Sequence, residues 1–315
     1  MKKRIFSVIS AALCLILTLL AIGCTSLNVP TYTESETLFG GFAGVIESES
    51  ATLEQTEKGT EKQTEKKTEK RTEKRTEKQT EPTVTFRVRF GSYNIYHGGN
   101  NKDLKKIAAN IVNNGIEIVG LQEVDNNTNR SGKVNQVKRL SELTGYKYYY
   151  FFKAISHDGG EYGTAILSKY PIESSNKIKL SSGSAEQRVL GHCVINVNGE
   201  KINFFVTHLS YDGEEGGASR SKQFSEVAAE LAKYDNFVLS GDFNTRNLDE
   251  YSVIAGSKLV NSKENPQITY PDGKSPLDNL VYSTSTWKFG IINVVKESYS
   301  DHYMIHSVGT FTKKK

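Results

Sequence analysis

Residues 84–315 predict an α/β fold in which two packed β-sheets carry helices on their outer faces. Many short apolar runs of strand type fill this part of the sequence. Three or four segments with helical spacing of apolar residues lie between the runs. Together these elements favour sheets packed face to face with helices outside. At roughly 230 residues, the region has a usual size for an α/β or layered domain.

Strands are predicted where apolar, aromatic and β-branched residues cluster between turn residues. The dipeptide Asn198-Gly199 separates two such clusters and is a strong signal for a two-residue hairpin. An aromatic run over 146–152 suits either stacking on nucleic-acid bases or packing, and packing is the favoured interpretation. In chain order, the predicted strands are 86–95, 116–121, 146–152, 164–167, 172–180, 189–197, 202–207, 237–240, 277–283, 288–295 and 303–311.

Helices are predicted where apolar residues recur three and four positions apart. In the first helix these residues run from Leu104 to Ile111, and Gly115 marks the stop. Gly145 closes the second helix in the same way. The predicted helices span 102–113, 134–143 and 219–231.

Residues 1–24 predict a lipoprotein signal peptide. The basic start Lys2-Lys3-Arg4 precedes an uncharged apolar run from Ile5 to Ile22. The segment Leu20-Ala21-Ile22-Gly23-Cys24 is similar to a bacterial lipoprotein processing site, at which Cys24 is lipidated and becomes the new N-terminus. An uncleaved transmembrane anchor is the alternative, because the run approaches the length that spans a bilayer. Both interpretations place the rest of the chain at the extracellular face of the cell membrane.

Residues 25–83 predict a disordered tether. From Thr56 to Pro82 the chain repeats a four-residue unit of the type Thr-Glu-Lys-x. A helix with this period would align like charges at i and i+4, and the unit has no apolar side chain to bury. The segment is therefore predicted to be a spacer between the membrane and the folded domain. Binding of acidic wall polymers through the basic residues of the repeat is the alternative.

Charge and cysteine content exclude two classes of protein. The chain has a net charge of only +4, so it lacks the basic field of a dedicated duplex-DNA binder. Cys14 lies in the signal peptide and Cys24 is the predicted lipid site, which leaves Cys193 alone in the domain. The domain therefore has no internal disulfide, and Cys193, within an apolar run, is predicted to be a core residue.

Polar residues of a catalytic type follow several predicted strands. Asp242 and Asn244 come directly after the strand 237–240, and alternation along an extended chain directs both to one side. An acid and an amide held side by side can position a water molecule and a phosphate oxygen. Similar positions at strand ends hold Asn94, Glu123, His208, Asp278, Asp301 and His302.

These residues as a set favour one kind of metal. A turn or a helix cap explains any one of them alone, but the whole set offers oxygen and imidazole donors without a thiolate. Such donors suit Mg²⁺, which retains several waters and takes few protein ligands, with Mn²⁺ and Ca²⁺ as alternatives. Thiolate sites of the kind that hold structural zinc are absent.

Four segments of this set carry a resemblance to a known family: Ser92-Tyr93-Asn94-Ile95, Leu121-Gln122-Glu123-Val124, Ser240-Gly241-Asp242-Phe243-Asn244 and Ser300-Asp301-His302-Tyr303. Over residues 86–312 the chain resembles the endonuclease/exonuclease/phosphatase superfamily, which includes deoxyribonuclease I and the neutral sphingomyelinases. It is most similar to exported bacterial members, through Asp125, Thr128, Arg130, Ser131 and the segment 159–163. The resemblance implies a four-layer α/β sandwich, in which two mostly antiparallel sheets are flanked by helices.

The resemblance also implies a metal site. Glu123 would be the main metal ligand, Asn94 a contact to the metal or to its water, and Asp301 would help to position the metal. Some family members carry a second acid two residues after the amide, where this chain has Tyr96. Two carboxylate ligands from that strand are therefore not expected.

Catalytic roles follow from the same resemblance. His208 and Asn244 would hold the scissile phosphate and its developing charge. Asp242 would orient or deprotonate the attacking water. Asp278 would pair with His302, which would act as acid or base or bind the phosphate. Whether Asp242 or His302 takes the proton stays open at this point.

The resulting hypothesis is a monomeric, lipid-anchored, metal-dependent phosphoesterase that hydrolyses a phosphodiester with activated water. Its substrate is a phospholipid or sphingolipid headgroup, or a nucleic acid, and the weak basic charge argues against duplex DNA. Arg188 is predicted to bind the substrate near its phosphate, with a salt bridge at the surface as the alternative. A phosphomonoesterase, or a non-catalytic surface binding module on the same fold, is the alternative function.

Overall fold

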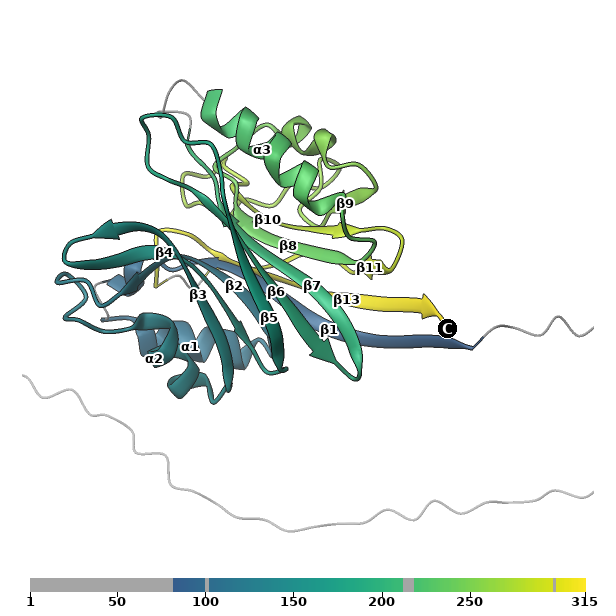
Figure 1. The fold of residues 1–315 in the computed structure, drawn as a ribbon, viewed down its shortest axis with the longest axis horizontal. Coiled ribbons are helices and arrows are strands. Elements are labelled where there is room, and N and C mark those ends of the chain that lie inside the picture. Colours follow the sequence, from purple (N-terminus) through teal and green to yellow (C-terminus); the bar gives the residue numbers. More distant parts are fainter. Residues whose placement is uncertain (1–81, 100–101, 212–217, 297–298) are drawn as a thin grey trace, which may run out of the picture. The chain divides into compact units, whose positions relative to one another are not determined.

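The computed structural model describes residues 82–99, 102–211, 218–296 and 299–315. The predicted signal peptide and nearly all of the predicted tether lie outside this part of the chain. The described residues form two β-sheets and the helices that cover them (Figure 1).

Each sheet is built mainly from neighbouring segments of the chain. Within the described residues, the first sheet has seven strands, in the order β11 (Trp287–Phe289), β13 (Met304–Lys314), β1 (Thr83–Asn94), β2 (Ile118–Asn126), β4 (Gly160–Ser168) and β3 (Tyr148–His157), with β12 (Asn293–Val295) also paired to β13. The second sheet has six described strands, in the order β5 (Ile172–Lys179), β6 (Val189–Val197), β7 (Glu200–His208), β8 (Phe237–Asp242), β10 (Asp278–Ser283) and β9 (Ser257–Leu259).

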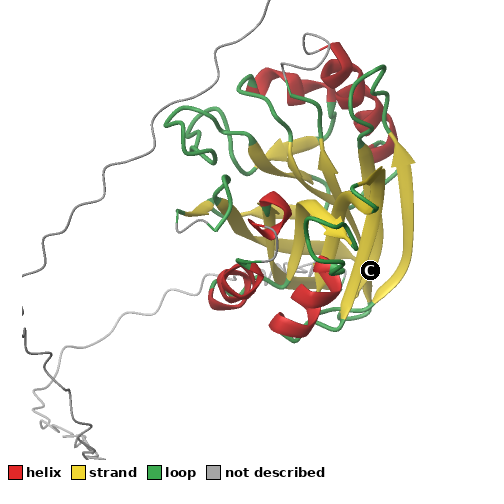
Figure 2. Cartoon of the chain, turned by 90° about the vertical axis from the view of Figure 1, so that its left-hand side faces the viewer, coloured by secondary structure: helices red, strands yellow, loops and turns green. Residues whose placement is uncertain are grey.

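Helices cover the outer face of each sheet, as Figure 2 shows. The helices α1 (Leu104–Asn113) and α2 (Gln136–Thr144) pack on the first sheet. The helix α3 (Ala218–Leu231) and the 3₁₀ helix η3 (Leu248–Val253) pack on the second. A short 3₁₀ segment, η1 (Tyr96–Gly99), follows β1. The predicted four-layer α/β sandwich with two mostly antiparallel sheets is therefore confirmed.

Two strand pairs are parallel, and they determine where the predicted site residues meet. β1 runs parallel to β2, with Asn94 opposite Gln122. β7 runs parallel to β8, with His208 opposite Asp242. Because the ends of parallel partners lie at the same edge of a sheet, each pair brings two polar strand ends together. The other strand pairs among the described residues are antiparallel.

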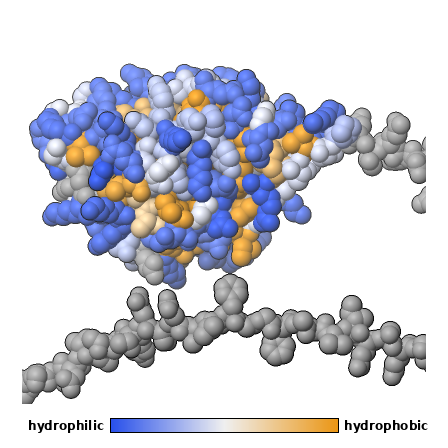
Figure 3. Space-filling model, turned by 90° about the horizontal axis from the view of Figure 1, so that it is seen from below, coloured by the Kyte–Doolittle hydropathy of each residue, from blue (hydrophilic) through white to orange (hydrophobic). Residues whose placement is uncertain are grey.

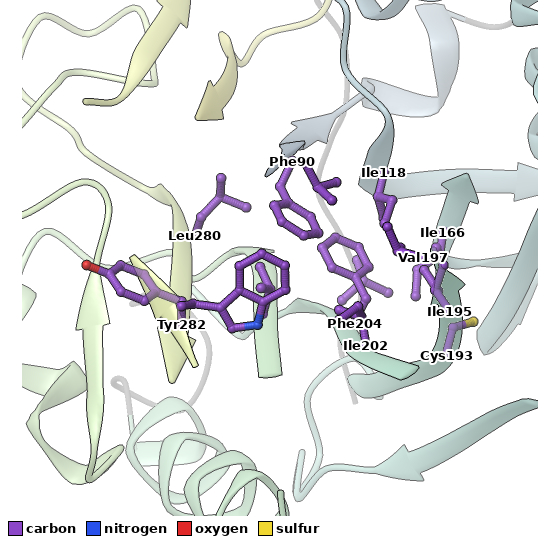
Figure 4. Close-up of a cluster of buried hydrophobic side chains, with 14 of the residues drawn as sticks. Phe90, Ile118, Ile166, Cys193, Ile195, Val197, Ile202, Phe204, Leu280 and Tyr282 are labelled. Carbon is purple, nitrogen blue, oxygen red and sulfur yellow. The ribbon is translucent and has the colours of Figure 1, made fainter. Parts of the chain in front are cut away.

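The main core lies between the two sheets. Phe90 of β1 and Phe204 of β7 face each other there, with ring centroids 5.6 Å apart (Figure 4). Cys193 belongs to the same cluster and is fully buried, which confirms its predicted packing role. Two further apolar clusters fill the spaces between each sheet and its helices.

The strand β1 shows how the sequence is divided between these layers. Val88 and Phe90 point to the core between the sheets, whereas Tyr93 packs toward the helices of the first sheet. This alternation follows from the two-residue period of a strand. It places the buried polar residues Ser92 and Asn94 on the face that meets the second sheet.

Turn and cap residues end the elements at the predicted places. The side chain of Asn135 accepts a hydrogen bond from Lys138 N (3.0 Å) at the start of α2, and Gly145 ends the helix with a left-handed φ of 74°. The hairpin between β6 and β7 turns at Asn198-Gly199, and both residues have positive φ. The predictions for Gly145 and for Asn198-Gly199 are therefore confirmed, whereas the cap at Asn135 was not predicted.

Several predicted segments differ from the structure in extent. β2 was predicted to end at residue 121, but it continues to Asn126 through a register shift opposite β4. The predicted strand 288–295 is two short strands, β11 and β12. In the aromatic run, Phe152 is buried in the core between the sheets and Tyr150 is exposed, so the run serves packing more than an aromatic surface.

The surface of the domain is mainly hydrophilic in the view of Figure 3, where the hydrophobic patches are separated by polar side chains. A search of the described residues found no helix with the length and apolar character needed to cross a membrane.

The spacing of the two sheets near the site depends on Gly120 of β2. A Cβ at this position would overlap Oγ of Ser240 and lie 2.9 Å from Val206 Cγ2, both of which belong to the second sheet. We expect Gly120→Ala to lower the free energy of unfolding by about 1–3 kcal/mol, because overpacking forces the sheets apart. Urea unfolding followed by circular dichroism measures this change.

The matched control is Gly290→Ala, where the nearest atom to a new Cβ is Val308 O at 3.8 Å. This control should change the stability by less than about 0.5 kcal/mol. Equal effects of the two substitutions would show that Gly120 does not set the spacing.

Candidate active site

The polar strand ends surround one pocket with a volume of about 470 Å³. Most of the predicted site residues line it, and they are Glu123, Arg188, His208, Asp242, Asn244, Asp301 and His302. The other two, Asn94 and Asp278, are buried behind this lining and form hydrogen bonds to it. The structure thus brings together all the residues that the sequence predicted as a site.

Asn94 connects the two sheets at the base of the pocket. Its Nδ2 donates to Oε1 of Glu123 and to Oδ2 of Asp242, each at 3.0 Å. Its Oδ1 accepts a hydrogen bond from Tyr96 N (3.1 Å). The amide therefore fixes the two carboxylates relative to each other, and its role as a contact to a metal stays a prediction.

Glu123 projects into the pocket because the backbone of β2 bulges at this point. Its φ is +56°, and the pairing of β2 with β4 shifts register between Leu121 and Val124. Burial raises the pKa of Glu123 to about 7; the hydrogen bond from Asn94 opposes the rise, and the charges of Asp301 and Asp242 add to it. Glu123 therefore lies where negative charge accumulates.

His302 lies between two carboxylates. Its Nδ1 is 2.8 Å from Oδ2 of Asp278, and its Nε2 is 3.5 Å from Oδ2 of Asp242. Burial by itself would lower the pKa of His302, but the charges of Asp278, Asp242 and Asp301 outweigh burial and raise it to about 10. The imidazole is therefore a buried cation at neutral pH. Burial raises the pKa of Asp242 to about 6, against the opposing charge of His302.

His208 is the neutral counterpart of His302. Burial lowers its pKa well below the usual value, and the nearby positive charges of Arg188 and His302 lower it further. Arg188 Nη1 lies 3.2 Å from Nδ1 of His208, and since a guanidinium only donates, Nδ1 accepts. Nε2 of the same ring lies 3.5 Å from Oδ2 of Asp242 and 3.0 Å from Nδ2 of Asn244.

Asn244 closes the pocket beside His208. Its Nδ2 donates to Leu209 O (2.9 Å) and lies 3.0 Å from His208 Nε2. Its backbone N–H donates to Oδ1 of Asp242 (2.9 Å), and its φ is +52°. The left-handed conformation turns the chain directly after β8, so that the acid and the amide both face the pocket, as the sequence predicted.

The sequence left two roles open for Arg188, substrate binding and a salt bridge, and its position in the structure is compatible with both. It lines the pocket, and Nη1 forms an ion pair with Oε1 of Glu186 at 3.0 Å. Only 7% of the Arg188 side chain but 33% of the Glu186 side chain is exposed, so the ion pair is partly buried. The pair holds a positive charge beside His208 at the pocket wall.

The residues present fit a hard divalent cation. Glu123, Asp242 and Asp301 offer carboxylate oxygens to one region of the pocket, where burial first, and then the charges of Asp301 and Asp242, raise the pKa of Glu123. A second candidate group is Asp242, Asp278 and His302, whose ligand atoms lie within 4.8 Å of one another. In that group Asp278 and His302 already form a hydrogen bond, which favours a proton between them over a metal.

The segment after Glu123 supports the pocket from the side. Asp125 is fully buried and accepts two hydrogen bonds from Arg130, at 2.8 and 2.7 Å, and one from Thr128 Oγ1 at 2.8 Å. The Arg130 guanidinium lies over the ring of Tyr162, 5.4 Å from its centroid, and Tyr162 lines the pocket. The residues that resemble exported bacterial proteins thus build one wall of the site.

Six residues that line the pocket were not predicted as site residues from the sequence. They are Tyr162, Glu186, Tyr211, Arg246, Tyr270 and Leu277. Tyr211 and Arg246 each follow a predicted site residue within three positions, which is a signal that could have been used. Tyr270 lies in a turn-rich loop, and its ring packs edge-on against His302 with centroids 5.0 Å apart.

A family model for the endonuclease/exonuclease/phosphatase family matches residues 91–302, which is more than half of the chain. The chain belongs to this family. Its members hydrolyse phosphate esters with divalent metals, and the family assignment applies to this chain at that general level. A comparison with curated proteins gave no significant match.

Solved structures of the family share the fold at low sequence identity. A family protein from Beutenbergia cavernae is 20% identical, with a TM-score of 0.59, over 71% of this chain and 72% of that one. Truncated TDP2 from Caenorhabditis elegans is 21% identical, with a TM-score of 0.57, over 71% of this chain and 97% of that one. The mannosyl-6-phosphatase Bt3783 from Bacteroides thetaiotaomicron is 16% identical, with a TM-score of 0.56, over 70% and 98%.

The charge of His302 depends on Asp278 and is open to measurement. We expect Asp278→Asn to lower the pKa of His302 from about 10, because the change removes the nearest negative charge and retains a hydrogen-bond acceptor. The imidazole then loses its proton at lower pH. Titration of the histidine side chains by ¹H–¹⁵N NMR follows this change.

Asp235→Asn is the control, since this residue lies in the loop before β8 and does not contribute to the pKa of His302. An unchanged titration of His302 in Asp278→Asn would contradict the assigned cause.

Proposed function

We propose that this chain is a Mg²⁺-dependent phosphoesterase that hydrolyses a phosphodiester with water. The main support is the arrangement of a neutral histidine, a cationic histidine and a carboxylate around one pocket, with Asp242 within 3.5 Å of both imidazoles. A phosphate ester needs positive charge to receive its oxygens and a base to activate water, and this arrangement offers both.

The metal would be held by Glu123 and Asp301, with Asn94 holding Glu123 in place. When bound, a divalent cation supplies charge stabilisation to the phosphate and a template for the attacking water. Mg²⁺ suits this set because its oxygen ligands are few and hard, and Mn²⁺ or Ca²⁺ would use the same donors.

The proton chemistry favours Asp242 over His302 as the base. A group with a pKa of about 10 holds its proton at neutral pH, so His302 is suited to bind a phosphate oxygen or to protonate the leaving group. Asp242 has a pKa of about 6, so it is mostly ionised at neutral pH and still basic enough to accept a proton from water. Asp278 keeps His302 charged and oriented.

Three groups are suited to hold the phosphate opposite the metal. His208 directs its Nε2 toward Asp242, at 3.5 Å from Oδ2, and the side-chain amide of Asn244 lies 3.0 Å from the same nitrogen. Arg188 adds a fixed positive charge behind His208. Hydrogen-bond donors that are already in place stabilise developing negative charge without reorganisation, which is the main source of catalysis in such sites.

The lining of the pocket also bears on the proposed substrate. The pocket walls are mostly charged and polar groups, which supports a polar phosphate ester, either a lipid headgroup or a nucleic acid, over an acyl chain. A phosphomonoester is the second candidate, because the pocket offers room for a terminal phosphate.

A lipid on Cys24 would hold a monomeric domain at the extracellular face of the membrane, with residues 25–83 as the tether.

Single substitutions in the pocket test the chemistry. We expect Glu123→Gln, Asp242→Asn and His302→Ala each to lower turnover by about 10²-fold or more, because each removes a charge that acts in the transition state. The three effects should not be additive, because the groups serve one transition state. Initial rates against Mg²⁺ concentration, on bis(p-nitrophenyl) phosphate, measure these changes.

The Mg²⁺ dependence separates the roles. Glu123→Gln should raise the Mg²⁺ concentration needed for half-maximal rate, whereas His302→Ala should not. Glu142→Gln, an exposed residue of α2, is the matched control and should retain wild-type rates. Near-normal turnover of Glu123→Gln at low Mg²⁺ would contradict the proposed metal site.

The lipid anchor is tested by labelling. We expect Cys24→Ala to abolish incorporation of radiolabelled fatty acid and to leave a slower-migrating precursor, because processing and lipidation both need this thiol. Cys14→Ala, within the apolar run of the signal peptide, is the control and should be labelled as the wild type is. Persistent labelling of Cys24→Ala would rule out Cys24 as the anchor.

A further inference from the structure

Two arginines line the pocket, and they differ in what remains available for a ligand. Arg188 has 7% of its side chain exposed, and its Nη1 is shared by Glu186 and His208. Arg246 has 56% of its side chain exposed and lies where the pocket opens to solvent. Its Nη1 forms no hydrogen bond to any residue that the structure describes. Arg246 is therefore the pocket cation that is open to a ligand.

The position of Arg246 is fixed by a turn that also carries Tyr270. Nε of Arg246 donates to Ser275 Oγ (2.7 Å), and Nη2 is 3.3 Å from Oδ2 of Asp272. Ser275 O in turn accepts the backbone N–H of Tyr270 (3.1 Å). Because Tyr270 packs against His302, this chain of contacts ties Arg246 to the catalytic imidazole. A cation held in place in this way loses little conformational freedom when a ligand binds.

Two tyrosines line the same pocket as Arg246. Tyr270 is partly exposed there, and 51% of Tyr211 is exposed. Large aromatic surfaces that are open to solvent at a binding site commonly stack on rings of a ligand. The opening thus combines one accessible cation with flat aromatic faces.

We infer that Arg246, flanked by Tyr211 and Tyr270, binds a second phosphate group on a substrate whose ring carries the scissile phosphate. This inference rests on the proposed function, since it places the ester bond at Asp242 and His302. It narrows the substrate class to small, water-soluble, ring-containing phosphate esters with two anionic groups. Such compounds are phosphomonoesters, the second candidate substrate above, and include nucleotides with two phosphates and sugar bisphosphates. A phosphodiester of a nucleotide that carries a second phosphate fits the same description.

An ion pair that only stabilises the turn is the simpler role for Arg246. An exposed pair of this kind contributes little to stability, and Asp272 is already held by the backbone N–H groups of Lys274 and Ser275 at 3.0 and 2.9 Å. The turn therefore does not need Arg246. A structural role would also affect all ligands alike, whereas a phosphate site distinguishes ligands that differ in one phosphate.

Two matched ligand pairs test the inference in the full chain with Mg²⁺. The first pair is thymidine 3′,5′-bisphosphate and thymidine 5′-monophosphate, and the second is fructose 1,6-bisphosphate and fructose 6-phosphate. Surface plasmon resonance under continuous flow gives the dissociation constants without depletion of the ligand by turnover. We expect the wild type to bind the bisphosphate of one pair at least about tenfold more tightly, as one charge-assisted contact provides. The ligand pair with the larger ratio of dissociation constants shows whether the preferred substrate is a nucleotide or a sugar phosphate.

The variants separate a binding role from a structural one. Arg246→Gln should reduce the ratio to less than about threefold, and Arg246→Lys should retain part of it because the charge remains. Asp272→Asn disturbs the same turn but keeps the cation, so the ratio should persist. Arg139→Gln, on the exposed face of α2, is the control and should match the wild type. A ratio near one for both pairs in the wild type, or an unchanged ratio in Arg246→Gln, would overturn the inference.

Turnover is measured separately, with thymidine 5′-(p-nitrophenyl phosphate) and its 3′-phosphorylated form. Absence of hydrolysis of any phosphodiester or phosphomonoester would refute the proposed function. The binding ratios would still decide whether Arg246 recognises a second phosphate.

Discussion

The gathering of four carboxylates around one imidazole, with Asp242 and Asp278 fully buried, is the constraint on which the rest of this site depends. Glu123, Asp242, Asp278 and Asp301 all act on His302 or on one another. Buried negative charges are unfavourable unless they are paired or form hydrogen bonds. The cation on His302 balances one part of the group, and the Asn94 amide holds another part in place. The negative charge at Glu123 is not fully balanced by these contacts. An excess of negative charge of this kind favours the binding of a divalent metal.

The backbone conformation of the site also costs free energy. Tyr96 and Asn244 follow the ends of β1 and β8, and Glu123 lies at the bulge within β2. All three have positive φ without being glycine. Such residues cost about 1–3 kcal/mol each and persist only where the surroundings determine them. Here Asn94 Oδ1 binds Tyr96 N, and Asp242 Oδ1 binds Asn244 N, so the side chains of the site hold its own strained backbone. Loss of either side chain would therefore disturb conformation as well as charge.

The site residues can be predicted from the sequence because they directly follow apolar runs. The contacts that these residues make with one another are harder to predict. Asp242 and Asn244 both face the pocket, as alternation predicted, although Asn244 does so through a left-handed turn after β8 and not through an extended strand. The approach of His302 to Asp278 depends on the packing of the segment before β13 against β10. The bulge at Glu123 has no signal in the apolar pattern, so β2 was expected to end five residues early. Tyr270 was missed for a related reason, because a loop residue reaches the pocket only through tertiary contacts.

The distance across the pocket is set by small residues that no catalytic motif would indicate. Along the inward face of β1, the side chains change from Phe90 to Ser92 to Asn94, so the contact between the sheets changes from aromatic stacking to hydrogen bonds. Ser240 Oγ donates to Ser92 Oγ (3.3 Å), and it can do so because Gly120 leaves the space that a Cβ would fill. This close approach lets Asn94 of one sheet reach Asp242 of the other at 3.0 Å. The catalytic geometry therefore depends on Gly120, a residue without a side chain that lies below the site. A wider gap between the sheets would separate the base from the residues that hold the metal.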